Sequence, residues 1–186
     1  ETDPDVSELE GAVAGGGWYD AGVAADISAA EFVVVTPDEE RHLFDGWTTY
    51  NMESIDDTSA LSTTVVMDSA KTVTANYQLQ YLVDYVVVGS ETGIVAPDAE
   101  WVKAGETAAE TFPDDNIVGG VKDVLDRVVP SLGDAITGPT TFTAFYEVWF
   151  KVTFAQNGLG TDAFGSVVTI NDVSFVYDDL PYELWV

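Results

Sequence analysis

The sequence contains no cysteine among its 186 residues. It can therefore form neither a disulfide framework nor a thiolate metal site. It also lacks any run of about 18 apolar residues, which excludes a membrane-spanning helix. The only histidine, His42, follows Arg41 on a predicted strand. Because no second histidine or cysteine is present, we expect His42 to be an ordinary strand residue rather than a zinc ligand.

Basic residues are scarce. Six lysine and arginine residues face 33 acidic ones, so the formal net charge is −27. Such a chain repels nucleic acid. Its self-repulsion also opposes compaction and assembly unless cations screen it, and the screening length falls from about 8 Å at physiological salt to about 3 Å at molar salt. We therefore expect the protein to work at high salt, with divalent cations or at low pH.

Hydrophobic residues make up 46% of the chain and aromatic residues 12%, which is enough to build cores. Threonine, valine and aromatic residues recur in short runs that glycine, proline, aspartate and asparagine interrupt. This pattern is typical of strands and turns. We expect an all-β fold, mainly antiparallel, of small β-sandwich or β-grasp-like units.

An internal repeat is visible when the sequence is compared with itself. Residues 68–77 match residues 137–146 at a shift of 69 positions, and the match continues from Tyr81 to Phe150. A second anchor, Trp18-Tyr-Asp-Ala-Gly22, matches residues 101–105 at a shift of 83 and then Trp185-Val186 at a further 84. We call the segment that ends each matched pair, 71–77 and 140–146, a closing strand.

The repeat divides the chain into repeat one (1–77), repeat two (78–146) and a tail (147–186). Only repeat two carries every part, because it begins with the strongly strand-like opening strand Gln80–Val88. Repeat one begins with a much weaker segment. The tail begins with an opening strand, Val148–Phe154, but ends at the tryptophan anchor. The two ends therefore resemble unmatched pieces of one repeat.

Repeat two also carries a segment with a different periodicity. Its apolar residues follow the spacing i, i+3, i+4, i+7, i+8, with glycine before and proline after; they are Val121, Val124, Leu125, Val128 and Val129. This spacing predicts one short amphipathic helix near 120–129, packed on a sheet.

Three motifs carry a resemblance to a known class of proteins. They are Gly17-Trp-Tyr-Asp-Ala-Gly22, Phe44-Asp-Gly-Trp47 and Lys71-Thr-Val-Thr-Ala75. The chain resembles the β repeats of archaeal and bacterial cell-surface and S-layer proteins. That resemblance implies small β domains, a structural or adhesive role outside the cell, and no catalytic residues.

Paired carboxylates are the main chemical feature. They lie in loop-like surroundings, where solvated turns are the first interpretation and calcium the second, since loop oxygens suit that ion. No other cofactor is indicated. The calcium candidates are Asp114, Asp115, Asp178 and Asp179. Acid/base catalysis by two carboxyl groups needs a pocket that separates their pKa values. The sequence also has no Gly-x-Ser-x-Gly motif, the turn that presents a nucleophilic serine. We therefore expect a protein that is not an enzyme.

The ends are the candidate functional site. We expect the tail of one molecule to complete repeat one of a neighbour by strand addition, which would build a head-to-tail homopolymer such as a filament, sheath, tube or S-layer. The donor residues are Val148, Trp149, Phe150, Val152, Phe154 and Trp185, and the acceptor residues are Val6, Leu9, Val13 and Trp18. Burying four large apolar side chains contributes on the order of 10 kcal/mol before the cost of association.

Two alternatives stay open. The chain belongs to a longer tandem array, in which both ends continue covalently, or it is a carbohydrate-binding adhesin whose exposed tryptophans contact glycans or other surface proteins. The chain opens at Glu1 without a methionine and a basic segment. We therefore expect a mature extracellular protein from which a signal sequence has been removed.

Overall fold

The computed structural model describes residues 11–186, so the acceptor residues Val6 and Leu9 lie outside the described residues. The chain divides into two compact units, each built from separate segments. Unit 1 contains the residues up to Asp84, Asp98–Ala109 and Leu132–Thr141. Unit 2 contains Tyr85–Pro97, Glu110–Ser131 and Phe142–Val186.

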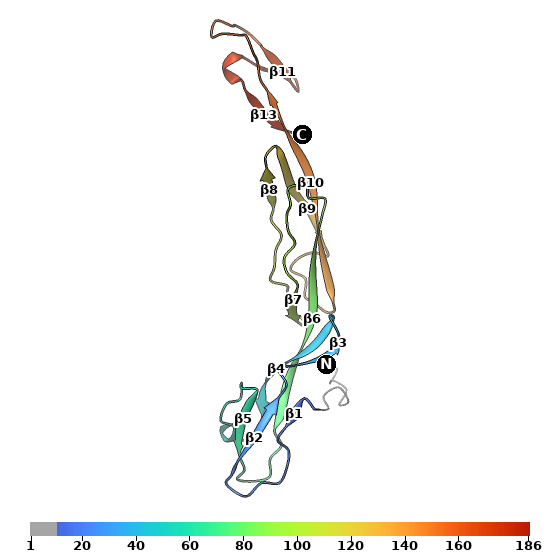
Figure 1. The fold of residues 1–186 in the computed structure, drawn as a ribbon, viewed down its shortest axis with the longest axis vertical. Helices are drawn as coiled ribbons and strands as arrows, with labels where there is room; N and C mark the ends of the chain where they lie inside the picture. Colours follow the sequence, from blue (N-terminus) through green and yellow to red (C-terminus); the bar gives the residue numbers. More distant parts are fainter. Residues whose placement is uncertain (1–10) are drawn as a thin grey trace. The chain divides into compact units, whose positions relative to one another are not determined.

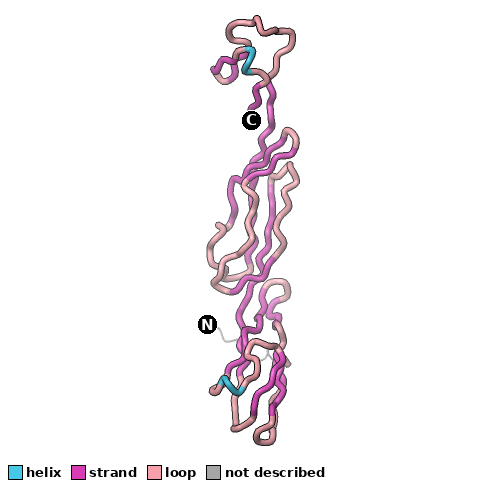
Figure 2. The backbone as a smooth tube through the Cα atoms, turned by 90° about the vertical axis from the view of Figure 1, so that its left-hand side faces the viewer, coloured by secondary structure: helices cyan, strands magenta, loops and turns pink. Residues whose placement is uncertain are grey.

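The expected all-β fold is confirmed. Helical residues in the described part of the chain are limited to the 3-10 turns η1 (Met52–Ser54) and η2 (Tyr177–Asp179), which are cyan in Figure 2. No described helix is long and apolar enough to cross a membrane.

Unit 1 contains two sheets (Figure 1). The first has the order β1-β2-β5, formed by β1 (Val13–Ala14), β2 (Ala24–Ala29) and β5 (Ser62–Val66). The second is formed by β3 (Phe32–Thr36), β4 (Glu40–Thr48), β6 (Thr74–Val88) as far as Asp84, and β7 (Glu100–Lys103); β6 pairs with β4 and β7. All these pairings are antiparallel.

The core of unit 1 lies between its two sheets. Trp47 of β4 is 2% exposed and packs with Ile27 of β2 and Val65 of β5, so the unit has the layered form of a β-sandwich. The indole nitrogen of Trp47 donates to the carbonyl of Ala60 at 2.8 Å, and the Phe44 ring contacts Trp47 edge to face. The indole therefore buries a large apolar area without leaving its polar atom unpaired.

Unit 2 is built around β10 (Thr140–Phe154), from Phe142 onward. The other strands are β8 (Asp115–Val118), β9 (Val121–Val129), β11 (Val168–Ile170), β12 (Val173–Phe175) and β13 (Tyr182–Trp185), with the end of β6 from Tyr85. β9 and β13 both pair with β10, and β11 pairs with β12. The core contains Tyr85, Phe112, Phe142, Ala144 and Tyr146.

The helix expected near 120–129 is wrong, because these residues form strand β9. Gly119 and Gly120 make a two-residue hairpin turn that joins Val118 to Val121. The register of β9 with β10 slips at Asp126, which is a bulge residue. A bulge shifts the alternation of a strand by one position, which accounts for the three-residue step from Leu125 to Val128. β-branched side chains then favour the strand.

The strand registers of the two units are related by the shifts found in the sequence. In unit 1, Leu82 of β6 lies opposite Trp101 of β7. In unit 2, Lys151 of β10 lies opposite Trp185 of β13. Lys151 follows Leu82 by 69 positions, and Trp185 follows Trp101 by 84. The tryptophan anchors Trp101 and Trp185 therefore pair with the same position of an opening strand.

The hairpins that precede the closing strands are also equivalent. β4 pairs Phe44 with Tyr77 and skips Asp45, whereas β9 pairs Leu125 with Tyr146 and skips Asp126. Both bulges thus occupy one position of the repeat, 81 residues apart. The segment that resembled a helix is the counterpart of the Phe44-Asp-Gly-Trp47 strand.

Trp47→Ala should destabilise unit 1 by about 3–5 kcal/mol, because it leaves a large cavity between the sheets. Trp18→Ala is the matched control, since Trp18 is fully exposed and its loss should change stability by no more than about 0.5 kcal/mol. Urea unfolding followed by near-UV circular dichroism measures both. Equal effects of the two substitutions would contradict this description of the core.

Candidate functional site

A groove of about 320 Å³ opens into the core of unit 1. One wall is the glycine-rich segment 13–17 with Tyr19, and the other is the start of the closing strand, Lys71–Val73. Core side chains form the floor: Ala25, Ile27, Trp47 and Val65, with Met67 beside them. The groove therefore ends on the core of the sandwich, whose side chains stay buried, with Trp47 and Val65 each 2% exposed.

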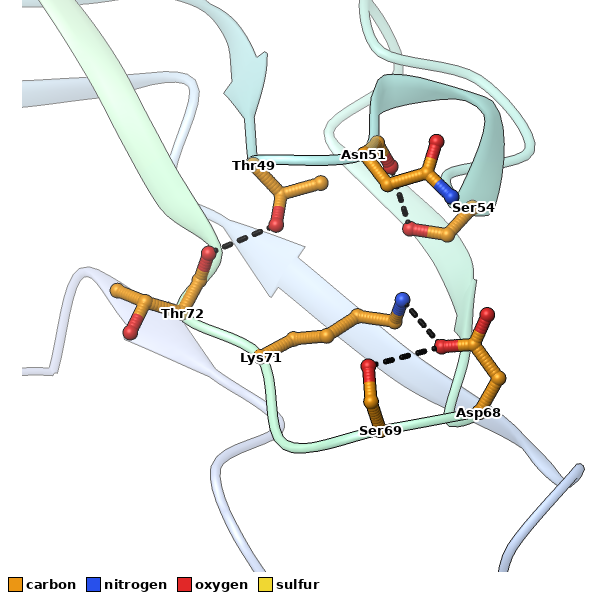
Figure 3. A network of polar contacts seen from close by, with 7 residues as sticks. All are labelled: Thr49, Asn51, Ser54, Asp68, Ser69, Lys71 and Thr72. Atoms are coloured by element: carbon orange, nitrogen blue, oxygen red, sulfur yellow. Dashed lines mark hydrogen bonds and ion pairs between the residues drawn. The ribbon is translucent and has the colours of Figure 1, made fainter.

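Polar contacts hold the rim of this groove in place (Figure 3). The hydroxyl of Thr49 donates to the carbonyl of Thr72 at 2.8 Å, and the Lys71 ammonium lies 2.5 Å from the Asp68 carboxylate. Hydrogen bonds from Lys71 and then Ser69 lower the pKa of Asp68 below its ordinary value. The Lys71 side chain is only 7% exposed, so it supports the loop 68–72 rather than reaching into solvent.

The closing strands of the two units differ in burial at matching positions. In unit 2, Phe142, Ala144 and Tyr146 are all buried. Their counterparts 69 positions earlier, Val73, Ala75 and Tyr77, are only half-buried. The two strands are otherwise anchored alike, because the Tyr77 hydroxyl donates to the Ala30 carbonyl and the Tyr146 hydroxyl to that of Pro113, 83 positions later.

In unit 2, the end of opening strand β6 lies beside closing strand β10 in the same sheet. The ring of Tyr85 stacks on that of Phe142 at a centroid distance of 5.9 Å. Gly89 passes so close to Tyr146 that a Cβ added to the glycine would lie 2.5 Å from the Tyr146 carbonyl oxygen. Because Tyr85 contacts Phe142 and Gly89 contacts Tyr146, residues 85–89 and residues 142–146 run parallel to each other. In unit 1, no strand among the described residues occupies the corresponding place.

The two described acceptor residues lie at this opening. Val13 lines the groove. Trp18 is 103% exposed and lines an adjoining hollow with Tyr19, Met67 and the loop 68–71. Its counterparts Trp101 and Trp185 both pair with opening strands. Trp101 also stacks against the Arg41 guanidinium at 4.4 Å. Trp18 has no strand partner in the described part of the chain.

The donor residues lie on strands that already have partners. Val148, Trp149 and Phe150 pair with β9, Val152 and Phe154 pair with β13, and Trp185 pairs back onto Lys151. None of residues 147–186 is buried, although the tail is rich in aromatic and aliphatic side chains. The tail is therefore paired through its backbone but has no core of its own.

The four calcium candidates form two separate pairs. Asp114 and Asp115 lie at the start of β8, where the Asp115 carboxylate is 3.2 Å from the Lys122 ammonium. Asp178 and Asp179 lie in η2, where the Asp179 carboxylate accepts from the Val176 amide. No group of three acidic or histidine residues in the described chain is arranged to hold a metal. Calcium binding by these residues stays a prediction.

The buried carboxylate of Asp123 was not predicted from the sequence. Asp123 of β9 is 0% exposed and accepts hydrogen bonds from the hydroxyls of Ser90 and Thr92, each at 2.6 Å, and from the amides of Glu91 and Thr92. Burial raises its pKa, but these hydrogen bonds outweigh burial and hold the pKa at about 2. Its acceptor sites are used within the chain, so Asp123 fixes the loop after β6 rather than binding a ligand.

Comparison with known protein families, curated proteins and solved structures gave no match.

Asp123 should make the stability of unit 2 depend on pH. A carboxylate with a pKa lowered from 3.8 to about 2 stabilises the folded state above pH 4. That contribution, about 2 kcal/mol, is lost as the pH falls from 4 toward 2. The difference in unfolding free energy between the wild type and Asp123→Asn should shrink over this range. A constant difference would contradict the assignment.

Proposed function

We propose that this protein is an extracellular structural subunit that assembles head to tail by strand addition into a cell-surface polymer. The groove of unit 1 is the acceptor, and the tail of a second copy is the donor. One observation carries the proposal. The closing strand of unit 2 has an opening strand beside it and its inward side chains are buried, whereas that of unit 1 has no described strand at the same edge and its side chains are half-buried next to a groove.

The condition of the tail supports a second copy as the occupant. A two-stranded pairing without a hydrophobic core is marginal in water. The tail nevertheless exposes large side chains, including Phe150 at 54%, Phe164 at 96% and Val173 at 57%. Docking against another subunit would remove such surface from water, at about 25 cal/mol for each Å² of apolar area. A strand edge without a partner beside the groove of unit 1 and an exposed apolar segment in the tail are complementary.

The geometry of addition leads to an open polymer. Donor and acceptor are different surfaces, so the contact is heterologous, and each added copy presents a new groove or a new tail. Such contacts form filaments, or sheets and tubes when filaments associate laterally. This arrangement fits the predicted role in a filament, sheath, tube or S-layer.

Complementation between two blocked variants tests the proposal. Val73→Glu places a charge at the groove but keeps the tail, and deletion of 155–186 removes most of the tail but keeps the groove. Each variant alone should remain monomeric, because one of its two ends is inactive. A mixture should form 1:1 dimers that do not grow, as measured by size-exclusion chromatography with light scattering.

The mixture controls for misfolding, since a dimer forms only if both proteins are folded. Val95→Glu is the matched charge control, because Val95 is 83% exposed in unit 2 and the variant should polymerise normally. Wild-type protein that stays monomeric at all concentrations would overturn the proposal. That result is expected if preceding residues of a longer chain fill the groove instead.

Assembly should strengthen with ionic strength. Each subunit carries a formal charge of −27, so neighbouring copies repel one another until salt screens them. The critical concentration for polymerisation should fall steadily between about 0.1 M and 1 M salt. Sedimentation of polymer across matched sodium chloride and magnesium chloride series measures this effect. A critical concentration that rises with salt would contradict an apolar, charge-opposed contact.

A further inference from the structure

The donor segment and its register can be identified by comparison with β6. We infer that residues 154–158 of one copy lie along residues 73–77 of the next, repeating the contact that residues 85–89 make with residues 142–146 in unit 2. This inference rests on the proposed assembly and specifies which part of the tail enters the groove.

The first support is the equivalence of β10 and β6. Both strands are 15 residues long. β6 uses residues 80–83 to pair with β7, and β10 uses residues 151–154 to pair with β13. In β6, the residues from Tyr85 to Val88 continue the strand and lie beside the closing strand of unit 2. The residues that follow in the tail, 155–158, have no strand partner in the described chain. They follow an anchored strand directly, but they are not themselves in a strand within one copy.

The second support is the side chain at the first contact. Tyr85 stacks on Phe142 in unit 2, and the residues at the matching positions are Phe154 and Val73. Phe154 is half-buried, and Val73 lines the groove. In the inferred register, the Phe154 ring packs on the Val73 side chain, which is an apolar contact like that between Tyr85 and Phe142. Val73 is smaller than Phe142, and it lines the groove that the Phe154 ring would enter.

The third support is a pair of glycines 69 positions apart. Gly89 has a positive φ of 84°, and a Cβ there would collide with the Tyr146 carbonyl. Gly158 has a φ of 91°, but nothing in its own copy lies within 4 Å of the Cβ position. The residue that matches Tyr146 is Tyr77, at the end of the open face. In the inferred register, Gly158 passes the Tyr77 carbonyl of the next copy.

The absence of cysteine allows the register to be tested by single introduced thiols. Phe154→Cys and Val73→Cys are placed in separate proteins, which are mixed, assembled and oxidised, so any disulfide between them joins two copies. A disulfide needs Cα atoms within about 7 Å. We expect efficient linked dimers from this pair. Lys151→Cys mixed with Val73→Cys is the control, since it lies about 10 Å away along the strand and should link poorly.

A second variant tests the close approach of Gly158. Gly158→Ala should raise the critical concentration about tenfold or more, because its Cβ would meet the neighbouring Tyr77 carbonyl. Gly165→Ala is the matched control. Gly165 lies in the same tail with a φ of 88° and open space around it, so an alanine there carries the same backbone strain without an intermolecular clash. Gly165→Ala should leave the critical concentration within about twofold of wild type.

The outcomes separate the register from the assembly. Polymers that link through Lys151→Cys rather than Phe154→Cys, or that tolerate both glycine substitutions equally, would overturn the register while leaving head-to-tail assembly in place. Failure of the wild type to polymerise overturns both. Linkage through Phe154→Cys together with selective loss of assembly in Gly158→Ala supports the register.

Discussion

The apolar inward face of the closing strand has to be covered, and the rest of the structure depends on how this is done. In unit 2, the end of β6 lies beside the closing strand, and Tyr85, Phe142 and Tyr146 are buried. In unit 1, the Tyr77 hydroxyl donates to the Ala30 carbonyl between β2 and β3, but the side chains at the matching positions stay half-buried. The cost of leaving apolar surface in water grows with its area, which is the physical basis for proposing unit 1 as the acceptor of a strand.

The repeat could be predicted from the sequence because its register depends on local pattern. Alternating apolar residues around Tyr77 and Tyr146 place both tyrosines on inward faces, and the shift of 69 between them is the shift that relates β6 to β10 in the structure. The tryptophan anchors behave likewise. Trp101 and Trp185 pair at equivalent positions because strand pairing preserves the sequence offset.

Other features could not be predicted from local pattern. The three-residue step from Leu125 to Val128 spans the bulge at Asp126, and only the pairing with β10 shows that an extra residue has been inserted there. The buried Asp123 depends on donors from residues 90–92, about thirty positions away. Its repeat counterpart is His42, which is also buried on its strand, so even the internal comparison gave no indication of a carboxylate there. The groove likewise depends on tertiary structure, since its floor combines residues from both sheets of unit 1.

The donor segment inferred from the structure extends beyond the strand that the sequence favours. Val148–Phe154 is the most strand-like part of the tail, and within one copy these residues pair with β9 and β13. Residues 155–158 have no strand partner in the described chain; they are less apolar and end at Gly158. Glycine weakens a strand, so such a segment looks unsuitable as a donor when it is judged alone. It becomes suitable beside a closing strand, because the carbonyl of the tyrosine on that strand leaves no room for a side chain at the glycine position.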